Sequence, residues 1–362
     1  MTSRERILTA LSHSEPDRCP TYGWFTGEAL KLMEQHLGVQ GQNALESALG
    51  IDRWRSVALS IERPRSRDLR LSQLIPDEYQ DTEGVEINDQ GWVTKVHAGR
   101  AHFYDYLWQP LQDARDPGEI DEYPFDKPEW IGVRDDTTHI IEGLKGESGV
   151  VLGRVNQPFK TACFLRGMEN MLCDMLMNEA IVDRIYDHLY GFNTTYAIHL
   201  VEAGVDVVQI FGDIAMQDRL MMSPETWRRF DKPRLADLIT RVKRVNPEVY
   251  VFMHTDGKVI DIIPDLVEIG LDILNPIQPE CQDPVDVKRK WGDRLVLHGA
   301  VSNQRSVPLG TIQEVKDEVK YLLDHCGAGG GFVLGPANAL QAAYPVDNVA
   351  AMYEAVAEYY SD

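Results

Sequence analysis

The feature that most restricts the fold of this chain is an apolar run that ends abruptly in polar residues. In VYVFMHTDG, residues 249–257, apolar and aromatic residues lead directly into His254, Thr255 and Asp256. A run that is apolar on both faces and then turns polar predicts a buried parallel strand whose C-terminal end opens onto a loop. Ligands and reacting groups of parallel α/β proteins lie at such ends.

The same pattern returns along the chain, separated each time by segments with helical periodicity. Further runs of this kind begin at Gly149, Val205, Leu271, Arg294 and Gly331. The segment TYGWF, residues 21–25, predicts one more strand. Repeated strand and helix units favour right-handed parallel crossovers, so the sequence predicts an α/β fold, a (β/α)8 TIM-type barrel.

Between Gly84 and Trp108 the pattern changes to short alternation with turn residues. Asp89-Gln90-Gly91 is typical of a hairpin turn, and β-favouring residues flank it. We therefore expect an antiparallel β-hairpin insertion over residues 84–108, near the face that carries the strand ends. Its aromatic residues either cover a ligand or form a satellite hydrophobic cluster. No Pro/Ser/Gly-rich linker divides the chain, so residues 1–362 are expected to form a single barrel domain.

The net charge of the chain limits the partners that it can bind, and its cysteines indicate the cellular compartment. The net charge of −21 opposes nucleic acid and anionic membranes, and no apolar run is long enough to cross a bilayer. Five scattered cysteines without a CxxC pair favour a reducing compartment. The N-terminal segment is amphipathic rather than signal-like, so we expect a cytoplasmic protein.

His254 and Asp256 are the leading catalytic candidates, because residues two apart at a strand end leave on the same face. With Asp213, which follows the strand from Val205, they form a set suited to a divalent metal such as zinc. The alternative is that His254 donates to a backbone carbonyl and Asp256 caps the next helix. Substrate-binding candidates by position are Tyr22, Asn156, Gln209, Asn275, Gln278, His298 and Asn338. His298 is also expected as a hydrogen-bonded core residue.

Several segments together resemble the uroporphyrinogen decarboxylase superfamily, which includes corrinoid-dependent methyltransferases. They are SEPDRCP, FLRGMENML, GVDVVQIFGDIAMQ, MSPETWRRFDKP, MHTDGKVIDIIPDLVEIGLDILNPIQP, WGDRLVLHGAVSNQ and YPVDNVAAMYEAV. The order and spacing of these segments carry the resemblance, which spans nearly the whole chain. It implies a (β/α)8 barrel, in agreement with the periodicity.

The chain departs from two chemistries of this superfamily. Uroporphyrinogen decarboxylases have an RQAGR-like segment for substrate carboxylates, where GWFTGEALKLMEQ places Glu28 and no arginine, although arginines at 53, 55, 63, 65 and 67 could substitute. The thiol-methylating branch binds zinc through an HxC pair and a later cysteine. Here His254 matches, but Asp256 and Asn338 stand at or near the cysteine positions. Any bound metal should therefore have oxygen and imidazole ligands, unless Cys281 substitutes.

The resemblance implies a methyltransferase of a corrinoid-dependent methyl-transfer or demethylation system. It would move a methyl group between a small methylated substrate and the cobalt of a corrinoid (cobalamin) on a separate partner protein. The alternative is a uroporphyrinogen decarboxylase-like decarboxylase or lyase acting on a small or tetrapyrrole carboxylic acid. A third reading is a corrinoid- or tetrapyrrole-binding protein without catalysis. Assembly into a homodimer stays open.

Overall fold

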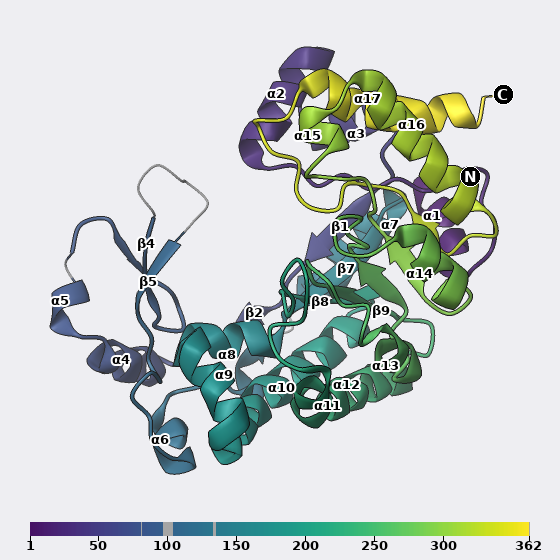
Figure 1. Cartoon of the computed structure of the whole chain (residues 1–362). Helices are drawn as coiled ribbons and strands as arrows, with labels where there is room; N and C mark the ends of the chain where they lie inside the picture. Colours follow the sequence, from purple (N-terminus) through teal and green to yellow (C-terminus); the bar gives the residue numbers. More distant parts are fainter. Residues whose placement is uncertain (81, 97–103, 133–134, 362) are drawn as a thin grey trace.

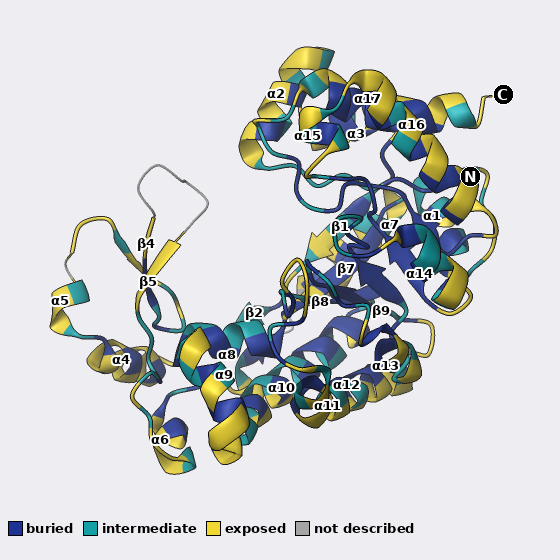
Figure 2. Ribbon diagram, in the orientation of Figure 1, coloured by how far each residue is buried: buried dark blue, intermediate teal, exposed yellow. Residues whose placement is uncertain are grey.

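The computed structural model describes residues 1–80, 82–96, 104–132 and 135–361. Its central strands are β1 Trp54–Val57, β7 Val150–Asn156, β8 Val207–Phe211, β9 Tyr250–His254, β10 Ile273–Asn275, β11 Val296–His298 and β12 Phe332–Val333. They form one parallel sheet in the order β1-β7-β8-β9-β10-β11-β12 (Figure 1). Strands β8 to β12 are buried on both faces, because helices pack outside and side chains fill the inside, whereas β1 is partly exposed (Figure 2).

The segment 20–22 closes this sheet into a barrel. Thr21 forms a parallel bridge with Leu334, and the Tyr22 N–H donates to the Leu334 carbonyl at 2.8 Å. On the other side, the Asp52 N–H donates to the Thr21 carbonyl at 3.2 Å, just before β1. The predicted α/β barrel is confirmed, but its expected strand over residues 21–25 is reduced to two isolated parallel bridges, Thr21 with Leu334 and Phe25 with Leu340.

Strand β1 was not predicted, and its sequence explains why. Only Trp54 is fully buried in this strand, and Arg55 beside it points outward to an ion pair with Glu46 at 2.7 Å. A half-buried, ion-paired arginine next to one buried aromatic residue lacks the continuous apolar run by which the other strands were identified.

Helices cover the barrel from outside. Those around the strands are α7 Asp135–Gly146, α8 Pro158–Arg166, α9 Met168–Met177, α10 Glu179–Glu202, α11 Pro224–Phe230, α12 Lys232–Val245, α13 Ile263–Glu268 and α14 Pro284–Trp291. A second group, gathered at the upper right of Figure 1, contains α2 Gly27–Leu37, α3 Gln42–Leu49, α15 Ser306–Leu309, α16 Ile312–Leu322 and α17 Val346–Tyr359. No helix among the described residues is long and apolar enough to cross a membrane.

The segment FLRGMENMLCDMLMN has helical periodicity throughout but forms two helices. Helix α8 ends at Arg166 and α9 begins at Met168. Gly167 between them has a φ of +87°, a conformation that residues with a Cβ rarely adopt. The apolar periodicity continues across this break because both helices pack on the same core.

Helix α1, Ser3–Leu11, plugs the N-terminal end of the barrel. Thr2 and Glu5 form a capping box at its start. Its Ile7 and Leu11 pack with inward-facing strand residues in one buried cluster, which stabilises the fold by about 2 kcal/mol for each side chain. Arg4 fixes the helix through a 2.6 Å ion pair with Asp206 at the start of β8.

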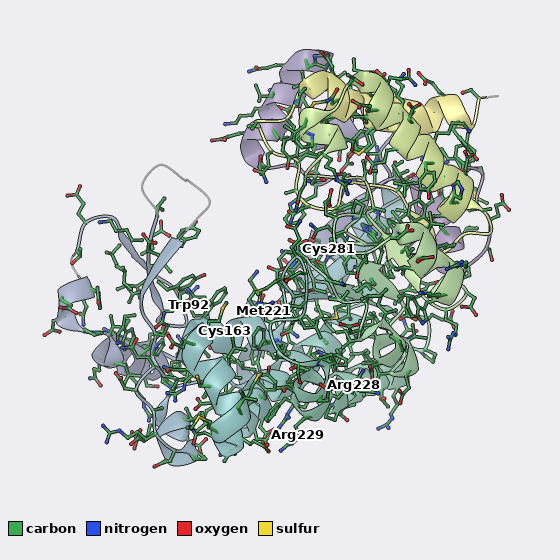
Figure 3. All side chains as sticks on the ribbon, in the orientation of Figure 1. Trp92, Cys163, Met221, Arg228, Arg229 and Cys281 are labelled. Atoms are coloured by element: carbon green, nitrogen blue, oxygen red, sulfur yellow. The ribbon has the colours of Figure 1, made fainter. Side chains whose placement is uncertain are left out.

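The predicted antiparallel insertion is confirmed as a sheet of its own. It contains β3 Val85–Ile87, β4 Val93–Val96 and β5 Tyr104–Trp108, so it has a third strand beyond the expected hairpin. Residues 97–103 of this segment lie outside the described residues. Helices α4 Arg65–Leu74, α5 Asp77–Gln80 and α6 Pro117–Glu122 accompany it. Trp92 packs against α8, where its ring centroid lies 5.0 Å from that of Phe164 (Figure 3).

Candidate functional site

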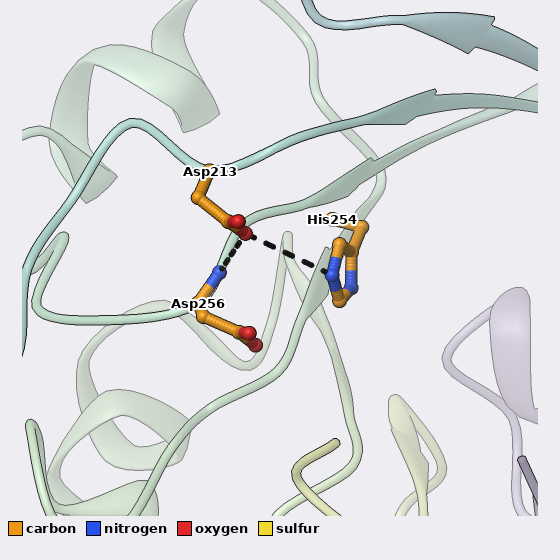
Figure 4. Close-up of side chains that lie close together, drawn as sticks. All are labelled: Asp213, His254 and Asp256. Carbon is orange, nitrogen blue, oxygen red and sulfur yellow. Dashed lines mark hydrogen bonds and ion pairs between the residues drawn. The ribbon is translucent and has the colours of Figure 1, made fainter. Parts of the chain in front are cut away.

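Asp213, His254 and Asp256 meet at the C-terminal mouth of the barrel. Each offers one possible ligand atom, and these three atoms lie within 4.8 Å of one another. Asp213 Oδ1 lies 4.0 Å from His254 Nε2 and accepts the Asp256 N–H at 3.2 Å (Figure 4). The structure therefore brings together the three residues that the sequence suggested as a metal-binding set, and their catalytic role stays a prediction.

Asn275 determines which nitrogen of His254 faces this set. The Asn275 Nδ2 lies 3.0 Å from the backbone carbonyl oxygen of His298, which can only accept. The amide nitrogen therefore faces His298, and the Asn275 Oδ1 accepts the Nδ1–H of His254 at 2.6 Å. Neutral His254 consequently presents an Nε2 lone pair toward Asp213. Metal-ligating histidines commonly have this second hydrogen bond.

The environment shifts the pKa values of the three groups in different directions. Burial lowers the pKa of His254 despite its bond to Asn275. Burial raises the pKa of Asp256 to about 7, with a further contribution from the negative charge of Asp213. Burial alone would also raise the pKa of Asp213, but the ammonium of Lys160 at 2.8 Å makes the net shift downward. Such divergence is typical of functional sites and also occurs in structural ion-pair networks.

The donor set fits a divalent cation. One imidazole nitrogen and two carboxylates suit a borderline or hard metal ion, and the buried Asp256 Oδ1 has no hydrogen-bond partner among the described residues. Cys281 does not belong to this cluster, and burial raises the pKa of its thiol to about 11. A thiolate from Cys281 is therefore not part of the set.

A cavity of about 220 Å³ lies inside the barrel below His254. Its wall is formed by residues of the strands, by the segment that closes the barrel, and by Gln42, Glu46 and Asp52. The carboxylates of Glu46 and Asp52 are ion-paired with Arg55 and Arg6. The wall contains four of the predicted substrate-binding residues, Tyr22, Gln209, Asn275 and His298. Asn275 forms hydrogen bonds with both His254 and His298, and His298 is fully buried. Both residues therefore also serve as hydrogen-bonded core residues, as expected from the sequence for His298.

Arg154 of β7 lines the same cavity and was not among the predicted site residues. Its guanidinium carbon lies 4.1 Å from the centroid of the Phe211 ring, and its Nε donates to Gln209 Oε1 at 3.1 Å. The Phe211 ring in turn stacks on His254 at 4.3 Å. The sequence carried a signal for Arg154, because it alternates with Asn156 along the strand and so shares its face.

The other predicted residues line two further cavities, and the first of these shares Arg154 and Phe211 with the cavity inside the barrel. Asn156 lines a space of about 450 Å³ between the barrel and the insertion. Gln278 and Asn338 line a third space, of about 380 Å³, together with Asp256. Gln278 accepts the Gly257 N–H at 3.1 Å, and Asn338 donates its amide to Asp256. Both hold the loop after β9 in place, whether or not they also touch a substrate.

The fold and this site define a (β/α)8 barrel with an imidazole and two carboxylates at the C-terminal ends of its strands. Residues 107–359 match the uroporphyrinogen decarboxylase (URO-D) family. The chain belongs to this family.

The similar proteins include methyltransferases and uroporphyrinogen decarboxylases. The chain is 28% identical over 222 residues to the methylcobamide:CoM methyltransferase MtaA of Methanosarcina barkeri, which covers 61% of this chain and 62% of the relative. It is 22% identical to uroporphyrinogen decarboxylase of Hordeum vulgare, with 68% of this chain and 73% of the relative covered. A methyltransferase structure from Methanosarcina mazei superimposes with a TM-score of 0.63 at 21% identity, and covers 99% of both chains. This likeness supports the barrel fold.

Proposed function

We propose that this protein is a methyltransferase that moves a methyl group between a small methylated substrate and the cobalt of a corrinoid on a separate protein. The observation that carries the proposal is the convergence of the His254 lone pair and two carboxylates above an aromatic-lined cavity. The sequence similarity to the M. barkeri methyltransferase supports the same class. The five free cysteines support a cytoplasmic location for it.

In the demethylation direction, the bond between the methyl carbon and its heteroatom breaks while the carbon–cobalt bond forms. The cobalt supplies the electron pair, so no protein nucleophile is needed, and the heteroatom must receive a proton or a Lewis acid. His254 and Asp256 face the position where this heteroatom would lie, and Asn275 holds the imidazole in place. Asp213, His254 and Asp256 would hold a divalent cation, which would supply Lewis-acid activation there.

The test is to add cob(I)alamin and candidate methyl donors to the purified protein and to follow methylcobalamin by its absorbance. Methylcobalamin should form with the wild-type protein and not with His254→Ala. His139→Ala is the matched control, because His139 lies on α7 with its side chain 82% exposed. Binding of a corrinoid without turnover for any donor would instead favour a binding protein without catalysis.

A decarboxylase or lyase is the second candidate, and Arg154 favours it. An arginine at the barrel mouth could hold a substrate carboxylate while Asp256, whose pKa burial raises to about 7, protonates the carbanion. A tetrapyrrole is disfavoured as the substrate, because the arginines that might have replaced the missing RQAGR-like segment include Arg55 and Arg63, and both are already ion-paired. Release of CO2 from small acids, without methylcobalamin formation, would establish this second function.

A further inference from the structure

The cavity inside the barrel is rich in hydrogen-bond donors that have no acceptor. His298 accepts the Asn275 amide at Nδ1, so its Nε2 carries the proton, and that N–H has no partner among the described residues. The indole N–H of Trp54 is also buried without a partner there. An unsatisfied buried donor costs about 1–3 kcal/mol. Two such donors around one cavity therefore favour a ligand that brings acceptor atoms.

Arg154 adds a positive charge to the same wall. Among the described residues no carboxylate lies within 4 Å of its guanidinium, whereas the buried Arg67 and Arg166 each have one. Its contacts with Gln209 and Phe211 fix the guanidinium plane, and among the described residues its terminal N–H groups have no acceptor, so they are free to donate to a ligand in the cavity that Arg154 lines.

The cavity walls restrict the shape of what can enter. The rings of Tyr22, Trp54 and Phe252 surround His298, with centroid distances of 4.6, 5.2 and 5.1 Å. Trp24 packs edge-on against His254 at the mouth, 5.9 Å between centroids. A cavity of about 220 Å³ with such walls suits a small planar body rather than a tetrapyrrole.

We infer that this cavity binds the carboxylate or sulfonate of a small planar substrate, and that Arg154 and Gln209 hold the anion. Arg154 donates its terminal N–H groups to the oxyanion, and the amide nitrogen of Gln209 is free to donate beside it, because its oxygen is used by Arg154 Nε. This inference names the substrate class of the proposed methyltransferase site. It depends on the proposed function only in assigning which end of the substrate reacts. The anion lies beside Arg154 and Gln209 near the mouth of the cavity, and the methylated end faces His254.

The test is direct binding by isothermal titration calorimetry without any corrinoid, with benzoate, benzenesulfonate and the neutral benzamide as probes. We expect one of the two anions to bind about 10- to 100-fold more tightly than benzamide, and the better anion identifies the oxyanion geometry. Arg154→Met should reduce its affinity to the level of benzamide, and Arg154→Lys should restore part of it. Gln209→Glu should abolish anion binding, because the new carboxylate pairs with Arg154. Arg289→Met on α14, where the side chain is 70% exposed, is the control and should change nothing.

Three results would overturn the inference. They are equal affinity of benzamide and the anions, unchanged anion affinity in Arg154→Met, and no binding of any probe to a folded wild-type protein. Each is independent of the methylcobalamin assay, so a failure of the proposed methyl transfer would not be mistaken for a failure of the anion site. In turnover, the Arg154 variants should raise KM for an anionic donor more than they lower kcat.

Discussion

Asp231 carries a carboxyl group whose burial should make the stability of the whole fold depend on pH. It is fully buried between α11 and α12 and accepts the hydroxyls of Tyr190 at 3.0 Å and Tyr186 at 3.1 Å, both from α10. Burial raises its pKa to about 6 from 3.8, although the hydrogen bonds oppose this. A folded-state pKa above the unfolded one means that the stability contribution is complete below pH 3.8 and is lost as pH rises through 6.

The size of the effect follows from these two values. Between pH 5 and pH 7.5, the contribution of Asp231 to the free energy of unfolding should fall by about 1.4 kcal/mol. Asp231→Asn cannot titrate, so the free energy of unfolding of the wild type minus that of the variant should fall by this amount. Urea unfolding of both proteins at several pH values measures it. Asp218→Asn, at a side chain that is 70% exposed, is the control. A wild-type–variant difference that stays constant with pH would refute the reasoning.

Three other predictions concern the mouth of the barrel. His254→Ala should abolish turnover and reduce stability less than His298→Ala, because His254 ends its strand at the barrel mouth whereas His298 lies inside the barrel. His298→Ala should reduce stability by about 1–3 kcal/mol, because it leaves a void and removes one of the two acceptors of the Asn275 amide. Retained activity in the first variant, with equal losses of melting temperature in both, would show that the roles are reversed. Asn275→Leu should lower turnover about 10- to 100-fold in a folded protein, since the imidazole loses the bond that orients it; an unchanged rate would contradict this. Elemental analysis after mild chelation should find weakly held metal, and X-ray absorption should find only oxygen and nitrogen ligands; tightly held zinc with sulfur ligands would show that a cysteine takes part.

The sequence predicted the parts of this fold that depend on continuous periodicity. Strand β9 could be recognised because the apolar run ends at His254, and the pair of His254 and Asp256 followed from alternation along the chain. Strand β1 could not, because ion pairing of Arg55 on its outer face interrupts the apolar pattern. The hydrogen bond between Asn275 and His254 could not be predicted either, since it depends on the register between β9 and β10. The number of residues between the two strands does not determine that register.

Helix α1 closes the N-terminal end of the barrel and leaves the C-terminal mouth as its entrance. Its Ile7 and Leu11 fill the N-terminal opening, so in the described part of the chain the route for a small molecule to the interior passes the strand ends near His254. In the proposed function, a carrier protein that delivers a corrinoid to His254 must dock over the same entrance. The small substrate therefore has to enter first, and its product has to wait until the carrier departs. Steady-state kinetics of the two-substrate reaction should accordingly show a compulsory order, with excess carrier acting as an inhibitor that is competitive with the small substrate.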